Sequence, residues 1–240
     1  GRFGDTIDTV DGNNLIIGDN GSVDYTAGVL IKTTDADDTT GDVDTIDAGE
    51  GNNVILGGAG GDTIDAGSNN DVVIGDHGEV YYDGGVLRHV TSALPDQGGI
   101  DTITLSGGDN VVIGGQAGDI ITTGIGADLI LGDSGDISYD ALGAVQVAMT
   151  SDHADGGNDA IDASAGNNIV LGGFGSDTLT TTGGDDIIIG DNGSVDYTAS
   201  VLIKTTDADD ATGDGDTIDA GEGNNVILGG AGGDTIDAGS

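Results

Sequence analysis

A nine-residue pattern recurs along most of this chain. Residues 57–65 read GGAGGDTID, a glycine-rich turn that leads through an aspartate into a triplet with an aliphatic middle residue. Three-residue strands joined by six-residue turns are too short to bury a core as isolated hairpins. They can form a coil whose turns stack on one another, with the middle side chain of each triplet pointing inward, because side chains alternate along a strand. The pattern therefore predicts an all-β solenoid.

The triplets belong to two alternating classes. Residues 45–47 read TID, with polar residues at both outward positions, whereas residues 54–56 read VIL and are apolar throughout. In a flattened roll, each class forms its own sheet. We therefore expect one sheet to face water and the other to present an apolar outer surface, which rarely stays exposed in a folded protein.

The pattern is organised in larger units. Tetrads of the form GD(N/H/S)G recur at intervals of 57, 57 and 58 residues, beginning at Gly18, Gly75, Gly132 and Gly190. They divide the chain into the end of a preceding unit at 1–17, units at about 18–74, 75–131 and 132–189, and an incomplete unit at 190–240. Residues 15–68 return as residues 187–240 with four substitutions, which indicates recent duplication. We interpret residues 1–240 as one continuous solenoid, a window on a longer array.

Each unit also contains one insert of a different kind. Residues 22–34 read SVDYTAGVLIKTT, two alternating runs around Ala27 and Gly28, which is typical of a β-hairpin. Its counterparts lie at 79–92, 136–151 and 194–206, so hairpin insertions are expected about every 57 residues. Two interpretations of the apolar sheet stay open. Either the hairpins cover it, or it contacts neighbouring repeats or a second molecule through lateral self-association.

The charge balance is extreme. Asp and Glu number 44 against 4 Lys and Arg, a formal net charge of −40, and such repulsion opposes a compact state. Acidic chains with few aromatic residues are commonly disordered, yet 35% of this chain is hydrophobic. The combination predicts folding when divalent cations neutralise the carboxylates. A nucleic-acid partner is not expected without a basic stripe, and no apolar run approaches the length of a membrane span.

The nonapeptides resemble the repeats-in-toxin (RTX) family, and the resemblance covers most of the chain outside the inserts. It implies a calcium-bound parallel β-roll in which the aspartate before each triplet and the turn glycines supply oxygen ligands, the hard donors that calcium takes at about 2.3–2.6 Å. The matching aspartates are Asp44, Asp62, Asp71, Asp101, Asp119, Asp128, Asp159, Asp177, Asp186, Asp216 and Asp234. Asparagine takes this place at Asn14, Asn53, Asn110, Asn168 and Asn225.

The two kinds of turn should lie on different edges of the roll. Every asparagine precedes a triplet of the apolar class, so one edge is all aspartate and the other alternates asparagine with aspartate. Asparagine keeps an oxygen but lacks the charge, and we expect weaker calcium binding on the second edge. Each tetrad aspartate either completes a calcium site where the insert interrupts the stack or caps a turn; these residues are Asp19, Asp76, Asp133 and Asp191.

Catalysis is not expected. His77, His89 and His153 occupy unrelated positions in different units, and we expect all three on the surface. A catalytic or metal-binding histidine needs oriented partners, which the repeats do not supply. The sequence contains no nucleophile elbow, phosphate-binding loop or HExxH helix motif, and it has no cysteine for disulfides or thiolate metal sites.

These observations favour an extracellular structural segment of a giant bacterial surface protein, such as an adhesin stalk, a filament or a surface-layer component. The resemblance implies export followed by folding on calcium, which is abundant outside the cell and scarce in the cytoplasm. The alternatives are a secretion and folding module of an exported enzyme or toxin and, less favoured, an ice- or glycan-binding solenoid. With 18 residues per layer, the 240 residues would give about thirteen layers and a length of roughly 60 Å.

Overall fold

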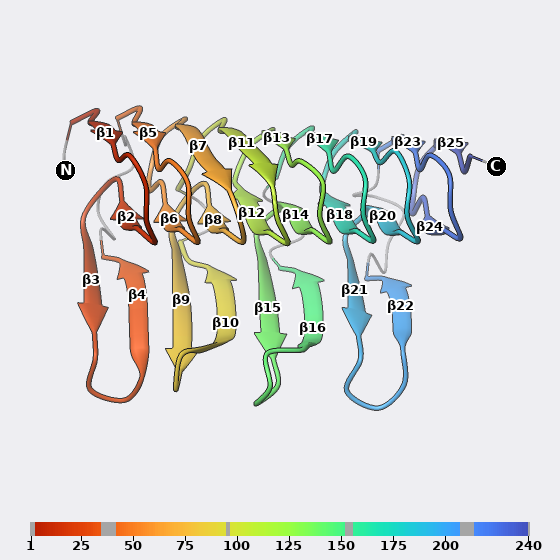
Figure 1. Ribbon diagram of the computed structural model, residues 1–240. Helices are drawn as coiled ribbons and strands as arrows, with labels where there is room; N and C mark the ends of the chain where they lie inside the picture. Colours follow the sequence, from red (N-terminus) through yellow and green to blue (C-terminus); the bar gives the residue numbers. More distant parts are fainter. Residues whose placement is uncertain (1–2, 35–41, 95–96, 152–155, 207–213, 240) are drawn as a thin grey trace.

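The computed structural model describes residues 3–34, 42–94, 97–151, 156–206 and 214–239, which form twenty-five strands in three sheets. Two parallel sheets make a flattened roll, and a third, antiparallel sheet lies against one of them (Figure 1). Within these ranges no helix is long and apolar enough to cross a membrane. The all-β parallel roll expected from the repeat is confirmed.

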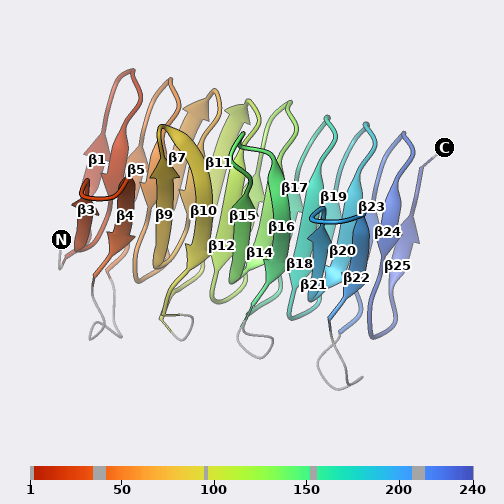
Figure 2. The ribbon, with the colours of Figure 1, turned by 90° about the horizontal axis from the view of Figure 1, so that it is seen from below.

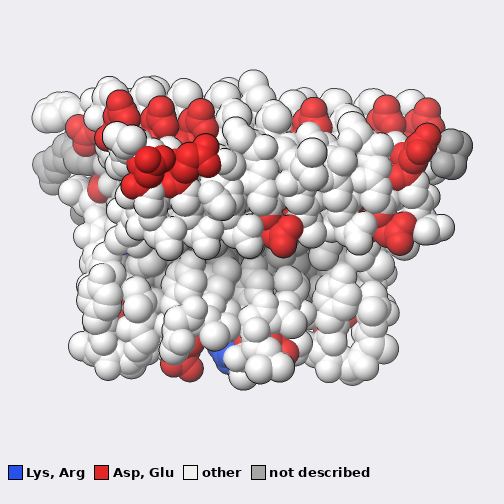
Figure 3. Space-filling model, viewed as in Figure 1, with Lys and Arg blue, Asp and Glu red and all other residues white. Residues whose placement is uncertain are grey.

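The first sheet of the roll, here the outer roll sheet, faces solvent on one side. Its strands, in spatial order, are β1 (Thr6–Asp8), β5 (Thr45–Asp47), β7 (Thr63–Ser68), β11 (Thr102–Gly107), β13 (Ile120–Thr122), β17 (Ala160–Asp162), β19 (Thr178–Thr180), β23 (Thr217–Asp219) and β25 (Thr235–Asp237). Outward residues such as Thr45 and Asp47 are exposed. Acidic side chains accordingly follow this sheet across the surface (Figure 3).

The second sheet, here the inner roll sheet, contains the apolar triplets. Its strands are β2 (Leu15–Ile17), β6 (Val54–Leu56), β8 (Val72–Ile74), β12 (Val111–Gly115), β14 (Leu129–Asp133), β18 (Ile169–Gly173), β20 (Ile187–Asp191) and β24 (Val226–Leu228). Equivalent residues stack in register, so Ile55 pairs with Ile16 on one side and Val73 on the other. The middle residues of both roll sheets form a continuous hydrophobic core that includes Ile46 and Ile55.

The roll is shorter than the chain length suggests. The outer sheet has nine strands, so at about 4.8 Å per layer the described roll is roughly 40 Å long. The expected thirteen layers and 60 Å are wrong because the inserts use residues without adding layers to the roll.

The inserts form hairpins at the expected places, and the hairpins join into one sheet. The strands of this hairpin sheet, in spatial order, are β22 (Leu202–Thr205), β21 (Gly193–Asp196), β16 (Val145–Thr150), β15 (Gly135–Tyr139), β10 (Val86–Ser92), β9 (Gly78–Asp83), β4 (Val29–Thr33) and β3 (Gly21–Asp24). Successive hairpins pair through β4 with β9, β10 with β15 and β16 with β21 (Figure 2). The geometry explains this continuity. Each unit advances the roll by two layers, and each hairpin is two strands wide.

The hairpin sheet covers the inner roll sheet and creates a second core. Leu56 and Ile74 from the roll cluster with Val80 and Ile137 from the hairpins, and all four are fully buried. Cover by the same chain, one of the two interpretations of the apolar surface, is therefore confirmed. The hairpins occupy much of this face, and lateral self-association of the chain stays a prediction.

The hairpin core makes a direct prediction about stability. Replacing Ile137 (0% exposed) by alanine should lower the free energy of unfolding by about 2–5 kcal/mol, because it leaves a cavity between the two sheets. Leu142 (90% exposed) lies in the same hairpin and provides a matched control, and Leu142→Ala should change stability by less than about 0.5 kcal/mol. Urea denaturation in saturating calcium measures both. Equal stability of the two variants would show that the hairpin sheet contributes no core.

The histidines differ from expectation. His77, the residue before β9, is fully buried, so its expected surface position is wrong. His89 on β10 is partly buried. Its Nε2 forms a hydrogen bond of 2.6 Å with Oδ2 of Asp136 on β15, and this bond raises the pKa of His89. His153 lies outside the described residues.

Candidate metal sites in the turns

Two positions of each turn hold the candidate metal ligands. Position 1 is the residue directly after one triplet, and position 6 is the residue directly before the next triplet. Turns that lead from the inner to the outer roll sheet form what we call the aspartate edge, where position 6 is Asp44, Asp62, Asp101, Asp119, Asp159, Asp177, Asp216 or Asp234. Turns that lead back form the asparagine edge, where position 6 is Asn14, Asn53, Asp71, Asn110, Asp128, Asn168, Asp186 or Asn225. The expected separation of the two edges is therefore observed.

On the aspartate edge, one carboxylate oxygen of each aspartate connects two layers. Oδ1 of Asp62 accepts a hydrogen bond from the backbone N–H of Asp44 at 2.7 Å, and Oδ1 of Asp101 accepts one from Asp62 at 2.6 Å. The same bond repeats along the whole edge as far as Asp234. This ladder fixes the orientation of every carboxylate and aims its other oxygen into the turn.

The other oxygen has no hydrogen-bond donor. Oδ2 is buried and unpartnered at Asp44, Asp62, Asp101, Asp119, Asp159, Asp177 and Asp216. Leaving a buried acceptor unsatisfied costs about 1–3 kcal/mol, and more when the group is charged. Because the same carboxylate oxygen is unsatisfied in seven turns, we infer that all seven take the same kind of partner.

Each unpartnered oxygen faces a backbone carbonyl across a space that only glycine leaves open. A methyl group placed on Gly114 would collide with Asp119 Oδ2 and with the carbonyl oxygen of Gly132 in the adjoining layer. The same pair of oxygens surrounds position 1 at Gly18, Gly57, Gly75, Gly132, Gly172 and Gly190, and no oxygen of these pairs lies more than 2.6 Å from the methyl position. We call this space a cradle. Its oxygens are all acceptors, carboxylate and carbonyl oxygens of the kind that calcium takes as ligands.

The cradles are not clusters of carboxylates. Across the described parts of the chain, no three acidic or histidine side chains converge as a metal-binding group. Each cradle instead combines one carboxylate oxygen with peptide oxygens, a donor set that suits calcium because it accepts backbone carbonyls readily.

The electrostatics of the edge are unfavourable for ionised aspartates alone. Burial, followed by the charge of Asp44, raises the pKa of Asp62 to about 7. Burial and the neighbouring Asp159 raise the pKa of Asp177 to about 9. Burial likewise holds the pKa of Asp101 and Asp119 well above the ordinary value of 3.8, with adjacent aspartates adding to the effect. At neutral pH this edge therefore requires either protons or cations.

The tetrad aspartates make a different contact. Oδ2 of Asp76 accepts a hydrogen bond from the backbone N–H of Gln116 at 2.5 Å, and its Oδ1 accepts one from Gly99 at 3.0 Å. Asp133 repeats both bonds in the next unit, and Asp19 and Asp191 accept backbone N–H bonds from the adjoining layer. These bonds are those of a turn cap, one of the two roles expected for these aspartates, and the completion of a calcium site stays a prediction.

The asparagines form hydrogen bonds within the asparagine edge. Oδ1 of Asn53 accepts a hydrogen bond from the backbone N–H of Asn14 at 2.9 Å, so this oxygen belongs to the ladder. Nδ2 of Asn53 donates to the carbonyl of Ala66 in the next layer at 3.0 Å. The amide nitrogen donates to a turn carbonyl at all five asparagines: in the adjoining layer at Asn14 and Asn53, and within the same turn at Asn110, Asn168 and Asn225. A nitrogen donor therefore faces the turn carbonyls on this edge, and the weaker calcium binding expected of these residues stays a prediction.

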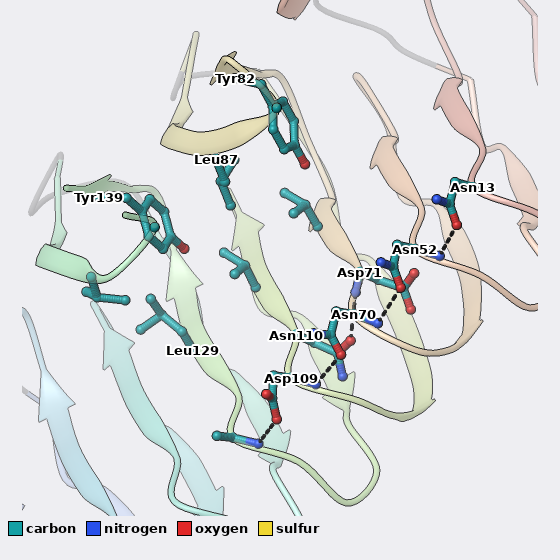
Figure 4. A pocket seen from close by; sticks show the side chains of 16 residues that line it. Asn13, Asn52, Asn70, Asp71, Tyr82, Leu87, Asp109, Asn110, Leu129 and Tyr139 are labelled. Atoms are coloured by element: carbon teal, nitrogen blue, oxygen red, sulfur yellow. Dashed lines mark hydrogen bonds between the residues drawn. The ribbon is translucent and has the colours of Figure 1, made fainter. Parts of the chain in front are cut away.

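A groove of about 600 Å³ separates the asparagine edge from the hairpin sheet (Figure 4). Tyr82, Leu87 and Leu129 lie along one side. Side-chain oxygens at the fifth turn position form a ladder on the other side, accepting backbone N–H bonds of 2.9–3.1 Å at Asn13, Asn52, Asn70 and Asp109. Sequence reasoning missed this ladder, although the recurring Asn-Asn and Asn-Asp pairs at positions 5 and 6 were its signal.

Comparison with known families gives one match. A family model of the RTX calcium-binding nonapeptide repeat, described as four copies, matches residues 38–73, 104–136, 153–179, 171–194 and 210–240, together more than half of the chain. The matched segments contain turns of both edges. Neither the curated proteins nor the solved structures give a match to this chain.

Proposed function

The chain belongs to the RTX calcium-binding nonapeptide repeat family and binds several calcium ions, and we propose that the aspartate edge is where it binds them. The ligands in this proposal are Oδ2 of Asp44, Asp62, Asp101, Asp119, Asp159, Asp177 and Asp216, together with the facing glycine carbonyls. Bound calcium supplies the positive charge that these converging acceptor oxygens lack. The chain is a calcium-binding repeat region of the kind found in exported proteins.

The observation that carries this assignment is the repeated cradle. Seven buried carboxylate oxygens without a donor each face a carbonyl oxygen across a position where only glycine occurs. A structural role for the aspartates alone would leave all seven unsatisfied. The ladder of Oδ1 bonds holds the oxygens at one geometry in every layer, so each site is organised by its neighbours.

We further propose that the segment is an extracellular, calcium-stiffened structural part of a large bacterial surface protein, such as a stalk, with no catalytic role of its own. The support is architectural. Three sheets run without interruption through all described units, and both cores are continuous along the same axis. In a repeat protein each layer is stabilised by its neighbours, so rigidity extends with the number of repeats. Linked binding and folding would keep the chain unfolded in low calcium during export.

Surface location can be tested on the cells that produce the protein. Antibodies raised against residues 42–94 should label intact cells in millimolar calcium, whereas a cytoplasmic control protein should stay unlabelled. Brief chelation of calcium should then increase cleavage of the labelled segment by an external protease by at least tenfold, because unfolded chains are cleaved far faster than folded ones. Labelling only after cell lysis would contradict the surface role and leave the calcium sites untouched.

A further inference from the structure

The two edges of the roll differ at position 1 as well as at position 6. On the aspartate edge, position 1 is glycine in every described turn, and the cradle beside it is open. On the asparagine edge it carries a side chain in every described turn: Thr9, Ala48, Ala66, Leu105, Thr123, Ala163, Thr181 or Ala220. Ala48, Ala66, Ala163 and Ala220 are fully buried. The space that forms a cradle on one edge is therefore occupied by side-chain carbon on the other.

The polar groups of the asparagine edge are paired with one another. Nδ2 of Asn14 donates to the carbonyl of Ala48 at 2.9 Å, and Nδ2 of Asn53 donates to the carbonyl of Ala66 at 3.0 Å. These are position 1 carbonyls of the adjoining layer, the same atoms that face an unpartnered carboxylate oxygen on the aspartate edge. At Asn14 and Asn53 the amide N–H group thus lies where a cation would otherwise be required, and at Asn168 and Asn225 it bonds to the position 1 carbonyl of its own turn.

Two aspartates of the asparagine edge have donors of another kind. Thr123 and Thr181, at position 1, donate hydroxyl hydrogen bonds of 2.7 Å to Oδ2 of Asp128 and Asp186. Asp71 is the exception among the described residues of this edge, because Ala66 stands in place of the threonine and Oδ2 has no donor. Figure 4 shows Asp71 beside Asn110, whose amide oxygen accepts the backbone N–H of Asp71 at 3.0 Å.

We propose that calcium binds along the aspartate edge alone. On the asparagine edge, asparagine amides and threonine hydroxyls take the place of the cation, and at Asp71, whose Oδ2 has no donor, the buried side chain of Ala66 occupies the position that glycine leaves open in a cradle. The inference rests on the proposed calcium sites and adds that this roll carries about one cation per layer instead of two. Half of the turns are then closed by hydrogen bonds that are independent of calcium. In the folded chain the asparagine edge is closed by its own hydrogen bonds, and the aspartate edge is the edge that calcium closes.

The number of bound calcium ions tests the proposal directly. Equilibrium dialysis followed by elemental analysis of the folded chain should give about as many ions as there are cradles, eight counting the half-cradle at Gly229 and Asp234. About sixteen ions would overturn the one-edge proposal while supporting the proposed function. An absence of bound calcium would overturn the proposed function itself, so the two failures are distinguishable.

A transplanted cradle provides the second arm. Ala48→Gly with Asn53→Asp reproduces the chemistry of the aspartate edge and should add one calcium ion, whereas Ala48→Gly alone should add none. Asp62→Asn on the aspartate edge should remove one ion. A folded double variant that binds no additional calcium would contradict the proposal. The count for the unaltered chain decides the question if the variants fail to fold.

Discussion

Removing calcium at neutral pH is expected to convert the chain from β structure to a largely unfolded state. Seven cradles would lose the charge that holds converging oxygens together, in a chain with a net charge of −40. A ligand present at one hundred times its dissociation constant stabilises the folded state by about 2.7 kcal/mol per site. Several such sites together exceed the 5–15 kcal/mol that typically separates folded from unfolded domains.

Far-UV circular dichroism during a calcium titration of the chelated chain measures this transition. We expect a cooperative change from coil to β structure with calcium and little change with magnesium, which requires near-ideal octahedral geometry and gives up its waters reluctantly. The two hydrophobic cores favour a chain that is folded even without calcium, because neither core contains calcium ligands. A β-rich spectrum in chelator would show that these cores suffice, and folding after export would then no longer follow.

Most of the roll was predictable because one chemical rule repeats every nine residues. The middle residue of each triplet must be buried and the turn must contain glycine, so strands, register and the two sheet classes follow from the sequence. The joining of the hairpins was missed, because it depends on distance along the roll. Val80 and Ile31 belong to hairpins of successive units. They pair only because each unit advances the roll by two layers and each hairpin is two strands wide.

The candidate sites were half predictable for a similar reason. The aspartates of the aspartate edge follow from the motif alone. The role of Asn53 depends on which amide atom faces Ala66, and the residue type does not specify this. The contrast between glycine at position 1 of one edge and alanine or threonine at the other was visible in the sequence. Its meaning became clear only when Gly57 was found beside an unpaired carboxylate oxygen of Asp62 and a carbonyl oxygen, and Ala48 was found buried.

Lowering the pH is expected to restore β structure in the absence of calcium. The folded-state pKa is raised to about 6 at Asp216, about 7 at Asp62 and about 9 at Asp177, above the unfolded value of 3.8, chiefly by burial. A raised folded pKa means that the folded state binds protons more tightly. Its contribution to stability is therefore complete below pH 3.8 and is lost as the pH rises through about 6 to 9. For Asp62 alone, the free energy of unfolding is on the order of 4 kcal/mol larger below pH 3.8 than above the folded-state pKa of about 7.

The calcium-free chain should accordingly be unfolded at pH 8 and regain β structure near pH 5, which stays above the isoelectric point of about 4.1 and so limits precipitation. Circular dichroism on metal-stripped protein across this range measures the effect. Asp177→Asn provides the matched variant, because an amide mimics the protonated carboxyl: it should stabilise the calcium-free chain at pH 8 and weaken calcium binding. With calcium present the trend should reverse, since protons compete with the metal for the same oxygens. A metal-free chain that stays unfolded at pH 5 would show that charge in the cradles is not what prevents folding.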